Sequence, residues 1–307
     1  MALWRDEKQG SSQMSADQFL NHAQSYRDDG VVILKQVLDA KTMGMIDAAY
    51  AWSHTHLTAA LQDFASDPQE RFIADTGYSV HESAYLTLLR ESLLPDIVHA
   101  LFGGKTDVWY MGEQIFYKEG KRGTRRTPWH QDSSYTNYFG RSMAAVWIPL
   151  DPIPPDCSFE VVRGSHKGIR YNGSRFEIGD DTAPLYPISA LPRLPDIEDN
   201  RNDWDIVGDA MVPGDVMVFH MGSLHGGGAT RPGMRRRSLT LRFIGDDVVW
   251  VEQSDTPHPD SSIARRTQAR ASGKSVAGAS AGEPAPASLG EALWRSNKFL
   301  RVRPWIE

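Results

Sequence analysis

The chain contains a single cysteine, Cys157, in 307 residues. This scarcity excludes an intramolecular disulfide and any cysteine-rich zinc or iron-sulfur site, and it is typical of a reducing compartment. No apolar run approaches the ~18 residues that a membrane-spanning helix needs, and the segment from Met1 to Gly10 lacks the apolar centre of a signal peptide. We therefore expect a cytoplasmic protein, in which histidine and carboxylate side chains would hold any metal.

Positive charge is also in short supply, because the formal net charge is −6 at pH 7. The basic residues cluster tightly only at Arg235–Arg237, which gives no electrostatic footprint for nucleic acid or for an anionic membrane. A hydrophobic content of 40% is enough to bury one large core. We expect a small molecule or a peptide as the partner, and the sequence leaves a homo-oligomer open.

The first third of the sequence predicts helices around one strand. Apolar residues recur at helical spacing from Ser15 to Asp29, from Asp39 towards Phe64, and from Ser83 to Phe102. Between the first two of these segments, the β-branched run at residues 31–34 predicts a buried strand. We therefore expect residues 1–105 to form a helical support region that contains one strand.

After this region, the pattern changes to short β-rich runs that are separated by glycine, proline and aspartate. Such runs, with no comparable helical pattern between them, predict an antiparallel sandwich or barrel. We expect a fold that is mainly β with flanking helices, in which residues 106–250 form the core and residues 251–307 a C-terminal extension. The β-rich runs lie at residues 107–118, 143–150, 159–162, 211–219 and 238–243.

Two segments fall outside this pattern. Residues 172–202 are rich in proline and aspartate, and this length favours a functional loop, such as a lid over a substrate, rather than a turn. Residues 271–289 are mostly alanine, serine, glycine and proline, so they can bury little apolar surface. We expect this second segment to be a flexible loop or linker.

The clearest chemical motif is the pair formed by His130 and Asp132. On an extended strand, these two side chains point to one face while Gln131 points to the other. Two imidazoles and one carboxylate, with further positions left open, form the ligand set that suits Fe(II) in non-haem oxygenases. Alone, such a pair is more often a chance pair at the surface, so the motif needs a second histidine from elsewhere.

His225 is the favoured second histidine. It follows a predicted turn and buried strand, and the three glycines after it let the backbone approach a ligand closely. His220 competes for this role, since both histidines have an arginine eleven residues further on. For His220, that arginine lies in Arg231-Pro232-Gly233, which predicts a turn rather than the start of a strand.

Arg236 follows His225 by eleven residues and opens a predicted strand. Strand alternation places Arg235 and Arg237 on the opposite face. A polar face inside a β barrel is costly unless it lines a site, and a guanidinium there can bind a carboxylate bidentately. The face that begins with Arg236 continues with Ser238, Thr240 and Arg242.

Together, these motifs resemble the Fe(II)- and 2-oxoglutarate-dependent oxygenases of the phytanoyl-CoA dioxygenase family. The likeness extends from about Phe19 to Phe243. It is carried by "DGVVIL", "WHQD", "VVRGSHKG", "PGDVMVFH" and "LHGGG" in this order, with "RRR" following. The resemblance implies a double-stranded β-helix, the jelly roll that cupins also have.

The resemblance also implies roles for particular residues. It places His130, Asp132 and His225 on Fe(II), and it places Arg236 on the distal carboxylate of 2-oxoglutarate. Two further residues, Gln114 and Trp147, match additional contacts to this co-substrate, although a tryptophan in an apolar strand is as often a core residue. His166, in "GSH", matches a structural element of the family.

The chain departs from the family pattern at two points. Asp156-Cys157 stands where many relatives have Asn-Gly, and Gly227 stands where the family often has serine two residues after the distal histidine. The second change removes one hydroxyl from the co-substrate site. Neither change affects the proposed metal ligands.

The implied activity is oxidation of an unactivated C–H bond in a small organic molecule, with O₂ and 2-oxoglutarate as co-substrates. Related halogenases have glycine or alanine in place of Asp132, so the carboxylate favours oxygenation. Hydroxylation is expected, in secondary or lipid metabolism, and desaturation or ring formation by the same chemistry stays an alternative.

A second alternative is a non-catalytic jelly-roll protein that holds a metal such as zinc, although structural zinc usually has four protein ligands. The substrate is not readable from the sequence. The candidates for lining an outer pocket are Tyr78, Tyr135, Asn137 and Tyr138.

Overall fold

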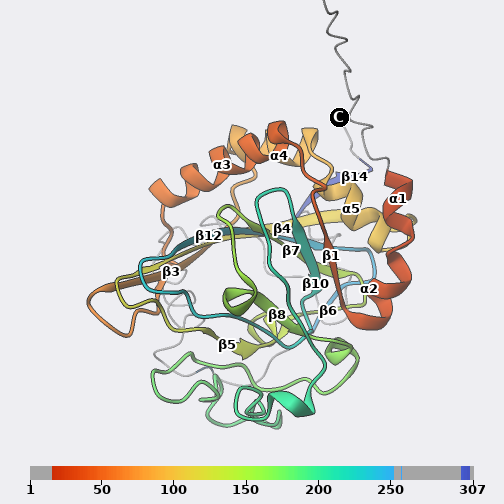
Figure 1. Ribbon diagram of the computed structural model, residues 1–307. Coiled ribbons are helices and arrows are strands. Elements are labelled where there is room, and N and C mark those ends of the chain that lie inside the picture. The colour runs from red at the N-terminus through yellow and green to blue at the C-terminus, as the bar shows by residue number, and fades with distance from the viewer. Residues whose placement is uncertain (1–15, 252–256, 258–298, 305–307) are drawn as a thin grey trace, which may run out of the picture.

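The computed structural model describes residues 16–251, 257 and 299–304 (Figure 1), and all structural statements below concern these residues. The predicted flexible segment at 271–289 lies outside them. No helix in the described part of the chain is long and apolar enough to cross a membrane.

The largest element is an antiparallel sheet of eight strands. The strand order is β1-β10-β7-β12-β4-β3-β2, and β14 also pairs with β4. The strands of this sheet are β1 (Val31–Leu34), β2 (Gln62–Asp63), β3 (Glu70–Gly77), β4 (Val108–Gly120), β7 (Met143–Pro149), β10 (Val216–His220), β12 (Arg235–Ile244) and β14 (Leu300–Arg303).

A second antiparallel sheet faces the first one, with the order β5-β11-β8-β9. The predicted jelly-roll fold is confirmed, and the four short 3-10 helices of the described chain lie in its connections. The second sheet contains β5 (Thr127–His130), β8 (Phe159–Val162), β9 (Ile206–Val207) and β11 (His225–Gly227), and β6 (Tyr138–Phe139) pairs separately with β13 (Val249–Trp250). The 3-10 helices are η1 (Asp132–Tyr135), η2 (Pro155–Cys157), η3 (Ser165–Lys167) and η4 (Arg201–Asp203).

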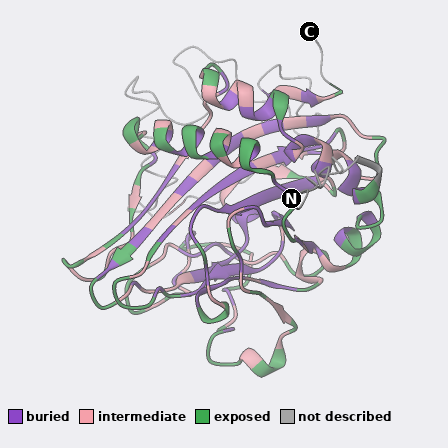
Figure 2. Cartoon of the chain, turned by 45° about the horizontal axis from the view of Figure 1, so that its top comes forward, coloured by how far each residue is buried: buried purple, intermediate pink, exposed green. Residues whose placement is uncertain are grey.

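Helices from the N-terminal region cover the outer face of the large sheet (Figures 1 and 2). Asp39 caps α3 by accepting a hydrogen bond from the Thr42 amide, and Gly30 ends α2 in the left-handed conformation. The helices are α1 (Ala16–Leu20), α2 (Ala23–Asp29), α3 (Ala40–Thr55), α4 (Ser83–Glu91) and α5 (Leu94–Leu101).

The large sheet is covered on both faces, which explains why β7 is a continuous apolar run. Val146 and its alternate neighbours pack against the helices, whereas Ala145 and Trp147 pack towards the second sheet. All seven residues of β7 are buried. On the neighbouring strand β12, Leu239 and Leu241 also face the helices, so the polar side chains of β12 face the space between the sheets.

Four predictions about the N-terminal region were wrong in detail. The helix predicted from Ser15 to Asp29 is two helices, α1 and α2. The helix predicted from Ser83 to Phe102 is two helices, because Pro95 lacks an amide hydrogen and is favoured in the first turn of a new helix. The helix predicted towards Phe64 ends at Thr55. The region holds three strands rather than one, since β2 and β3 were missed.

Strand β3 was missed because one of its buried residues is charged. Asp75 is only 4% exposed, and both of its carboxylate oxygens accept hydrogen bonds from Thr58, one from the amide and one from the hydroxyl. These contacts satisfy a buried carboxylate that would otherwise disfavour the strand. They depend on the folded chain and leave no local pattern in the sequence.

Candidate active site

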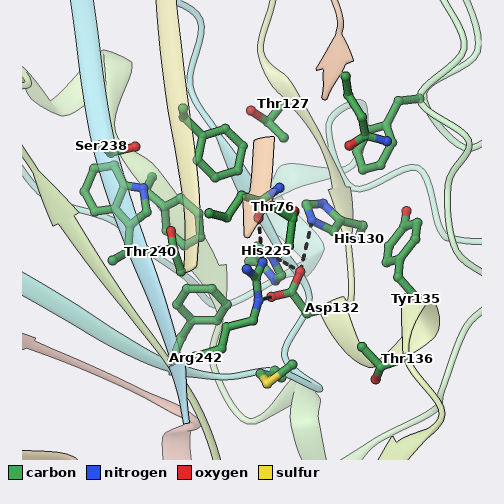
Figure 3. A pocket seen from close by; sticks show the side chains of 18 of the residues that line it. Thr76, Thr127, His130, Asp132, Tyr135, Thr136, His225, Ser238, Thr240 and Arg242 are labelled. Atoms are coloured by element: carbon green, nitrogen blue, oxygen red, sulfur yellow. Dashed lines mark hydrogen bonds and ion pairs between the residues drawn. The ribbon is translucent and has the colours of Figure 1, made fainter. Parts of the chain in front are cut away.

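The structure brings His130, Asp132 and His225 together between the two sheets (Figure 3). His130 ends β5 and lies directly opposite His225, the first residue of β11, in the antiparallel register. His130 and Asp132 were predicted to lie on one strand, but the strand ends at His130 and Asp132 is the first residue of η1. Gln131 is still extended, and its amide points away to donate to the carbonyls of Ile169 and Gly222.

The three side chains form a compact group. Asp132 Oδ1 lies 3.7 Å from Nε2 of His130 and 3.8 Å from Nε2 of His225. All three are buried, and their candidate ligand atoms lie within 4.8 Å of one another. Within the described residues, this is the one such cluster of histidine, cysteine and acidic side chains.

Backbone carbonyls orient both imidazoles. Nδ1 of His130 lies 2.8 Å from the Pro128 carbonyl, and Nδ1 of His225 lies 2.9 Å from the Ser223 carbonyl. A carbonyl only accepts hydrogen bonds, so each Nδ1 carries the hydrogen and each Nε2 presents a lone pair towards Asp132. This arrangement is typical of metal-binding histidines.

Burial also sets the charge of the group. Burial, together with the neighbouring His130, lowers the pKa of His225 to about 3, and burial lowers the pKa of His130 as well. For Asp132, burial raises the pKa, but Arg242 and the two histidines outweigh it and bring the pKa to about 2. The group therefore consists of two neutral imidazoles and a carboxylate, which is the protonation state that binds a metal.

Arg242 holds the far side of the Asp132 carboxylate. Its Nε donates to Asp132 Oδ2 at 3.0 Å (Figure 3). One of its terminal nitrogens donates to Gln114 Oε1 at 2.6 Å. The sequence placed Arg242 on the cavity face of β12 but indicated no role for it. Strand alternation from Arg236 was the available signal, whereas the pairing with Asp132 required the tertiary structure.

Arg236 lies on the same face of β12 and is only 5% exposed. One terminal nitrogen, Nη1, donates to the carbonyls of Cys157 (2.6 Å) and Gly228 (3.0 Å). Burial lowers the pKa of Arg236 to about 10. Among the described residues, no carboxylate forms an ion pair with Arg236, so a buried cation borders the cavity without an anion.

Gly227 leaves space beside this guanidinium. A Cβ atom at Gly227 would lie 3.0 Å from Nη2 of Arg236 and 3.1 Å from the Thr127 hydroxyl. The absent side chain therefore opens a gap between a cation and a hydroxyl. Thr127 was not predicted as a site residue. Its hydroxyl lies close to the place where a serine at position 227 would put its own hydroxyl.

One cavity of about 140 Å³ connects these features. Trp147 lines the cavity, where it could contact the co-substrate, and it also belongs to the core between the sheets. In this core it stacks on Phe159, with ring centroids 5.2 Å apart. The cavity wall includes the His-Asp-His group, Gln114, Trp147, Arg236, Ser238, Thr240 and Arg242.

Aromatic rings surround the two histidines. The ring of Phe219 lies 4.5 Å from that of His225, while the rings of Tyr135 and Phe176 stand edge-on to His130 at 5.8 and 5.1 Å. Tyr135 and Phe176 also stack on each other at 5.8 Å. Such a wall keeps water away and strengthens electrostatic interactions inside the cavity.

The loop at 172–202 is mostly packed against the protein. Its residues Leu194 and Ile197 are buried in a cluster with Trp129 on the second sheet. Near the start of the loop, Asn172 exchanges two hydrogen bonds with the backbone of Tyr186. Phe176 is the loop residue that lines the cavity, so a lid role would involve this end of the loop.

Of the four candidates for the outer pocket, only Tyr135 lines the cavity. Tyr78 instead stacks on Tyr110 at 5.9 Å, and Tyr138 contacts Trp250 at 5.6 Å. Asn137 is also absent from the wall. Closeness to Asp132 in the sequence did not predict which residues line the cavity, because the chain leaves the cavity between η1 and β6.

The competing histidine, His220, lies outside the group. Its ring is 5.0 Å from that of His166, whose Nε2 donates a hydrogen bond to the Arg27 carbonyl at 3.1 Å. His166 packs so closely to Gly30 that a Cβ there would lie 2.2 Å from its Nδ1. This packing agrees with a structural role for His166 and with the choice of His225.

A jelly roll that holds two histidines and one aspartate beside a cavity has the architecture of the mononuclear non-haem metal enzymes. The family model for phytanoyl-CoA dioxygenase (PhyH) matches residues 26–238, and the chain belongs to this family. A Caenorhabditis elegans protein described as a "probable phytanoyl-CoA dioxygenase" is 26% identical over 160 residues. This match covers 50% of the chain and 48% of the relative, so the chain spans about half of the length of this relative.

Solved structures with the same fold include two enzymes of nogalamycin biosynthesis and one further protein. The non-haem α-ketoglutarate-dependent epimerase SnoN has a TM-score of 0.57 at 16% identity, with 78% of this chain and 85% of SnoN covered. The carbocyclase SnoK has a TM-score of 0.54 at 18% identity, with coverage of 75% and 85%. EctD from S. alaskensis with bound Fe has a TM-score of 0.53 at 18% identity, with 79% of each chain covered. At these identities, the likeness establishes the fold.

Proposed function

We propose that this protein is an Fe(II)- and 2-oxoglutarate-dependent dioxygenase that hydroxylates an unactivated C–H bond of a small organic molecule. The observation that carries this proposal is the presence of two complementary half-sites in one cavity. The His130, Asp132 and His225 group offers three ligands, and Arg236 offers a buried cation without a carboxylate partner.

The ligand set fits iron better than structural zinc. Structural zinc sites are usually closed by four protein ligands, whereas this group has three and faces a cavity. Two imidazole nitrogens and a carboxylate oxygen suit Fe(II) in oxygenases. When bound, the iron supplies the oxidising chemistry, with O₂ and 2-oxoglutarate as co-substrates.

The side chains of the protein would orient these reactants. Arg242 donates a hydrogen bond to Oδ2 of Asp132, which leaves Oδ1 of this carboxylate to bind the metal. Arg236 binds the distal carboxylate of 2-oxoglutarate, with the Thr127 hydroxyl beside it. Because Oε1 of Gln114 accepts from Arg242, its amide nitrogen is left as a donor to the co-substrate.

The cavity walls would exclude water and position the substrate. Tyr135 and Phe176 flank His130 in the cavity wall, so we place the substrate against these rings. Desaturation or ring closure could follow the same initial hydrogen abstraction. The carbocyclase SnoK shows that the fold supports an outcome other than hydroxylation in that protein.

The test is a screen of small organic substrates for succinate release by the Fe(II)-loaded protein, with O₂ consumption measured in parallel. We expect both signals to rise together with a substrate that fits the cavity. The same protein loaded with zinc serves as the control and should be inactive. Iron-loaded protein that binds substrates but forms no succinate would favour the non-catalytic alternative.

Replacing Arg242 with methionine should weaken metal binding or activity by about 10- to 100-fold, the usual effect of removing a hydrogen-bond partner of a metal ligand. Asp132 would lose the partner that orients it. Arg163→Met is a matched control, because Arg163 pairs with Asp29 at the surface. Iron titrations and succinate assays measure the effect, and equal behaviour of both variants would contradict this role of Arg242.

Substrate binding should protect the backbone around Phe176 from hydrogen exchange, because this ring lies against His130 and would cover a bound substrate. The region around Leu194 and Ile197 should exchange equally in both states, since it is already buried. The measurement compares exchange with and without substrate in the presence of 2-oxoglutarate. Unchanged exchange near Phe176 would contradict a lid role.

A further inference from the structure

Lys118 is a completely buried lysine to which the proposed function gives no role. It lies on β4 with an exposure of 0%, directly opposite Arg236 on β12 in the antiparallel register. Strand alternation places it on the same face of β4 as Gln114, which lines the cavity. A lysine is almost never fully buried unless a partner compensates it.

The partners of Lys118 are neutral. Its Nζ donates to the carbonyls of Arg125 (3.1 Å) and Gly228 (3.4 Å), and it lies 3.9 Å from the ring centroid of Phe72. The Gly228 carbonyl is also the acceptor of Arg236, at 3.0 Å. The amine and the guanidinium therefore share one oxygen atom.

The charged groups that act most strongly on Lys118 are three arginines and one glutamate. Besides Arg236, the cations Arg125 and Arg126 face Lys118 from the connection between β4 and β5, and Glu70 faces it from β3. Arg126 pairs with Glu160 and Glu198, and Arg125 lies 3.8 Å from Asp181, whereas Arg236 has no such partner among the described residues. Glu70 already accepts hydrogen bonds from Ser66 and from the Arg125 amide. Burial lowers the pKa of Lys118 well below 10.5, and Arg236, Arg126 and Arg125 add to this effect.

Among the described residues, no carboxylate pairs with Lys118 or Arg236, so these two groups lack an anionic partner. Two adjacent buried cations are unfavourable without one, and a neutral amine beside Arg236 relieves the repulsion. A carboxylate bound to Arg236 would reverse the balance, because an opposite charge nearby favours the charged form of the amine. Lys118 does not line the cavity, so it would act through Arg236 and Gly228 rather than by touching the ligand.

We propose that Lys118 is a positioning residue for the acidic co-substrate, and that its amine takes up one proton from solvent when the distal carboxylate of 2-oxoglutarate binds Arg236. The resulting ammonium holds the Gly228 carbonyl and balances the incoming negative charge. The proton returns to solvent when the carboxylate leaves. This inference rests on the proposed function, because it requires 2-oxoglutarate at Arg236.

Calorimetry tests the proton uptake directly. Fe(II)-loaded protein is titrated with 2-oxoglutarate without oxygen, in phosphate and in Tris, whose ionisation enthalpies differ. We expect wild-type protein to take up a proton on binding, and Lys118→Met to take up none and to bind 2-oxoglutarate about tenfold more weakly, since a charge near a buried pair is lost. Lys121→Met is the control, because Lys121 lies in the adjacent turn and is exposed.

The outcomes separate this inference from the function on which it rests. Equal proton uptake by wild type and Lys118→Met, or equal affinity, would overturn the role of Lys118 while leaving the oxygenase proposal intact. If the wild-type protein binds iron but not 2-oxoglutarate, both the role of Lys118 and the oxygenase proposal are wrong. Iron content of the Lys118→Met variant confirms that its site is formed.

A second measurement needs no metal. If Lys118 is neutral in the free protein, the unfolded chain binds a proton that the folded chain does not, from about pH 10.5 down to the lowered pKa of the folded state. The stability of wild type should therefore fall relative to Lys118→Met as the pH decreases through this range. Parallel curves of unfolding free energy against pH would show a lysine that is already charged and would contradict the inference.

Discussion

Replacing Asp132 with alanine is expected to abolish succinate formation and to weaken iron binding. The variant loses one of three ligands and leaves Arg242 buried without its carboxylate partner. Because the loss of a mere hydrogen-bond partner of a metal ligand costs about 10- to 100-fold, the loss of the ligand itself should exceed this range. Iron content and succinate release under saturating 2-oxoglutarate measure the two effects.

Asp156→Ala is a suitable control for this variant. Asp156 also pairs with an arginine, Arg231, but the pair is exposed, so both iron binding and turnover should stay at the wild-type level. Undiminished turnover by Asp132→Ala would remove the assignment of the three ligands.

Replacing Arg236 with glutamine should leave iron binding unchanged and strongly raise the concentration of 2-oxoglutarate that turnover requires. The expected loss is about 2–5 kcal/mol, because a buried carboxylate loses its charge-assisted partner. Glutamine can still donate to one of the carbonyls of Cys157 and Gly228, which limits the disturbance of the fold. The dependence of succinate release on 2-oxoglutarate concentration gives the size of the effect.

The neighbouring arginine provides the control. Arg235 lies on the opposite face of β12, where it pairs with Asp151 and is half exposed, so Arg235→Gln should change the 2-oxoglutarate requirement little. A larger effect of Arg235→Gln than of Arg236→Gln would contradict the assignment of the cavity face.

The register of β12 was predictable because side chains on a strand alternate regardless of context. This rule placed Arg236 and Arg242 on one face of the strand and Arg235 and Arg237 on the other, and in the structure the first two line the cavity whereas the second two do not. Local features also distinguished His225 from His220. Three glycines follow His225, whereas the arginine eleven residues after His220, Arg231, lies in a predicted turn. Local sequence rules were therefore enough to predict the cavity face of β12 and the choice of His225.

Contacts between distant segments could not be predicted in this way. Asp132 and Arg242 are 110 residues apart in the sequence, and Lys118 and Gly228 are likewise 110 apart. Nothing in the local pattern of either pair indicates its partner. The buried Asp75 hid strand β3 for the same reason, because its hydrogen bonds come from the distant Thr58.

The visible spectrum of the protein with Fe(II) and 2-oxoglutarate under anaerobic conditions tests whether the two histidines and the aspartate hold an iron that 2-oxoglutarate can chelate. If His130, Asp132 and His225 hold iron with open positions, 2-oxoglutarate should chelate it through its keto and carboxylate oxygens and produce a weak charge-transfer band. The Arg236→Gln variant should need more 2-oxoglutarate to reach the same absorbance. A colourless mixture that nevertheless contains protein-bound iron and 2-oxoglutarate would contradict the account.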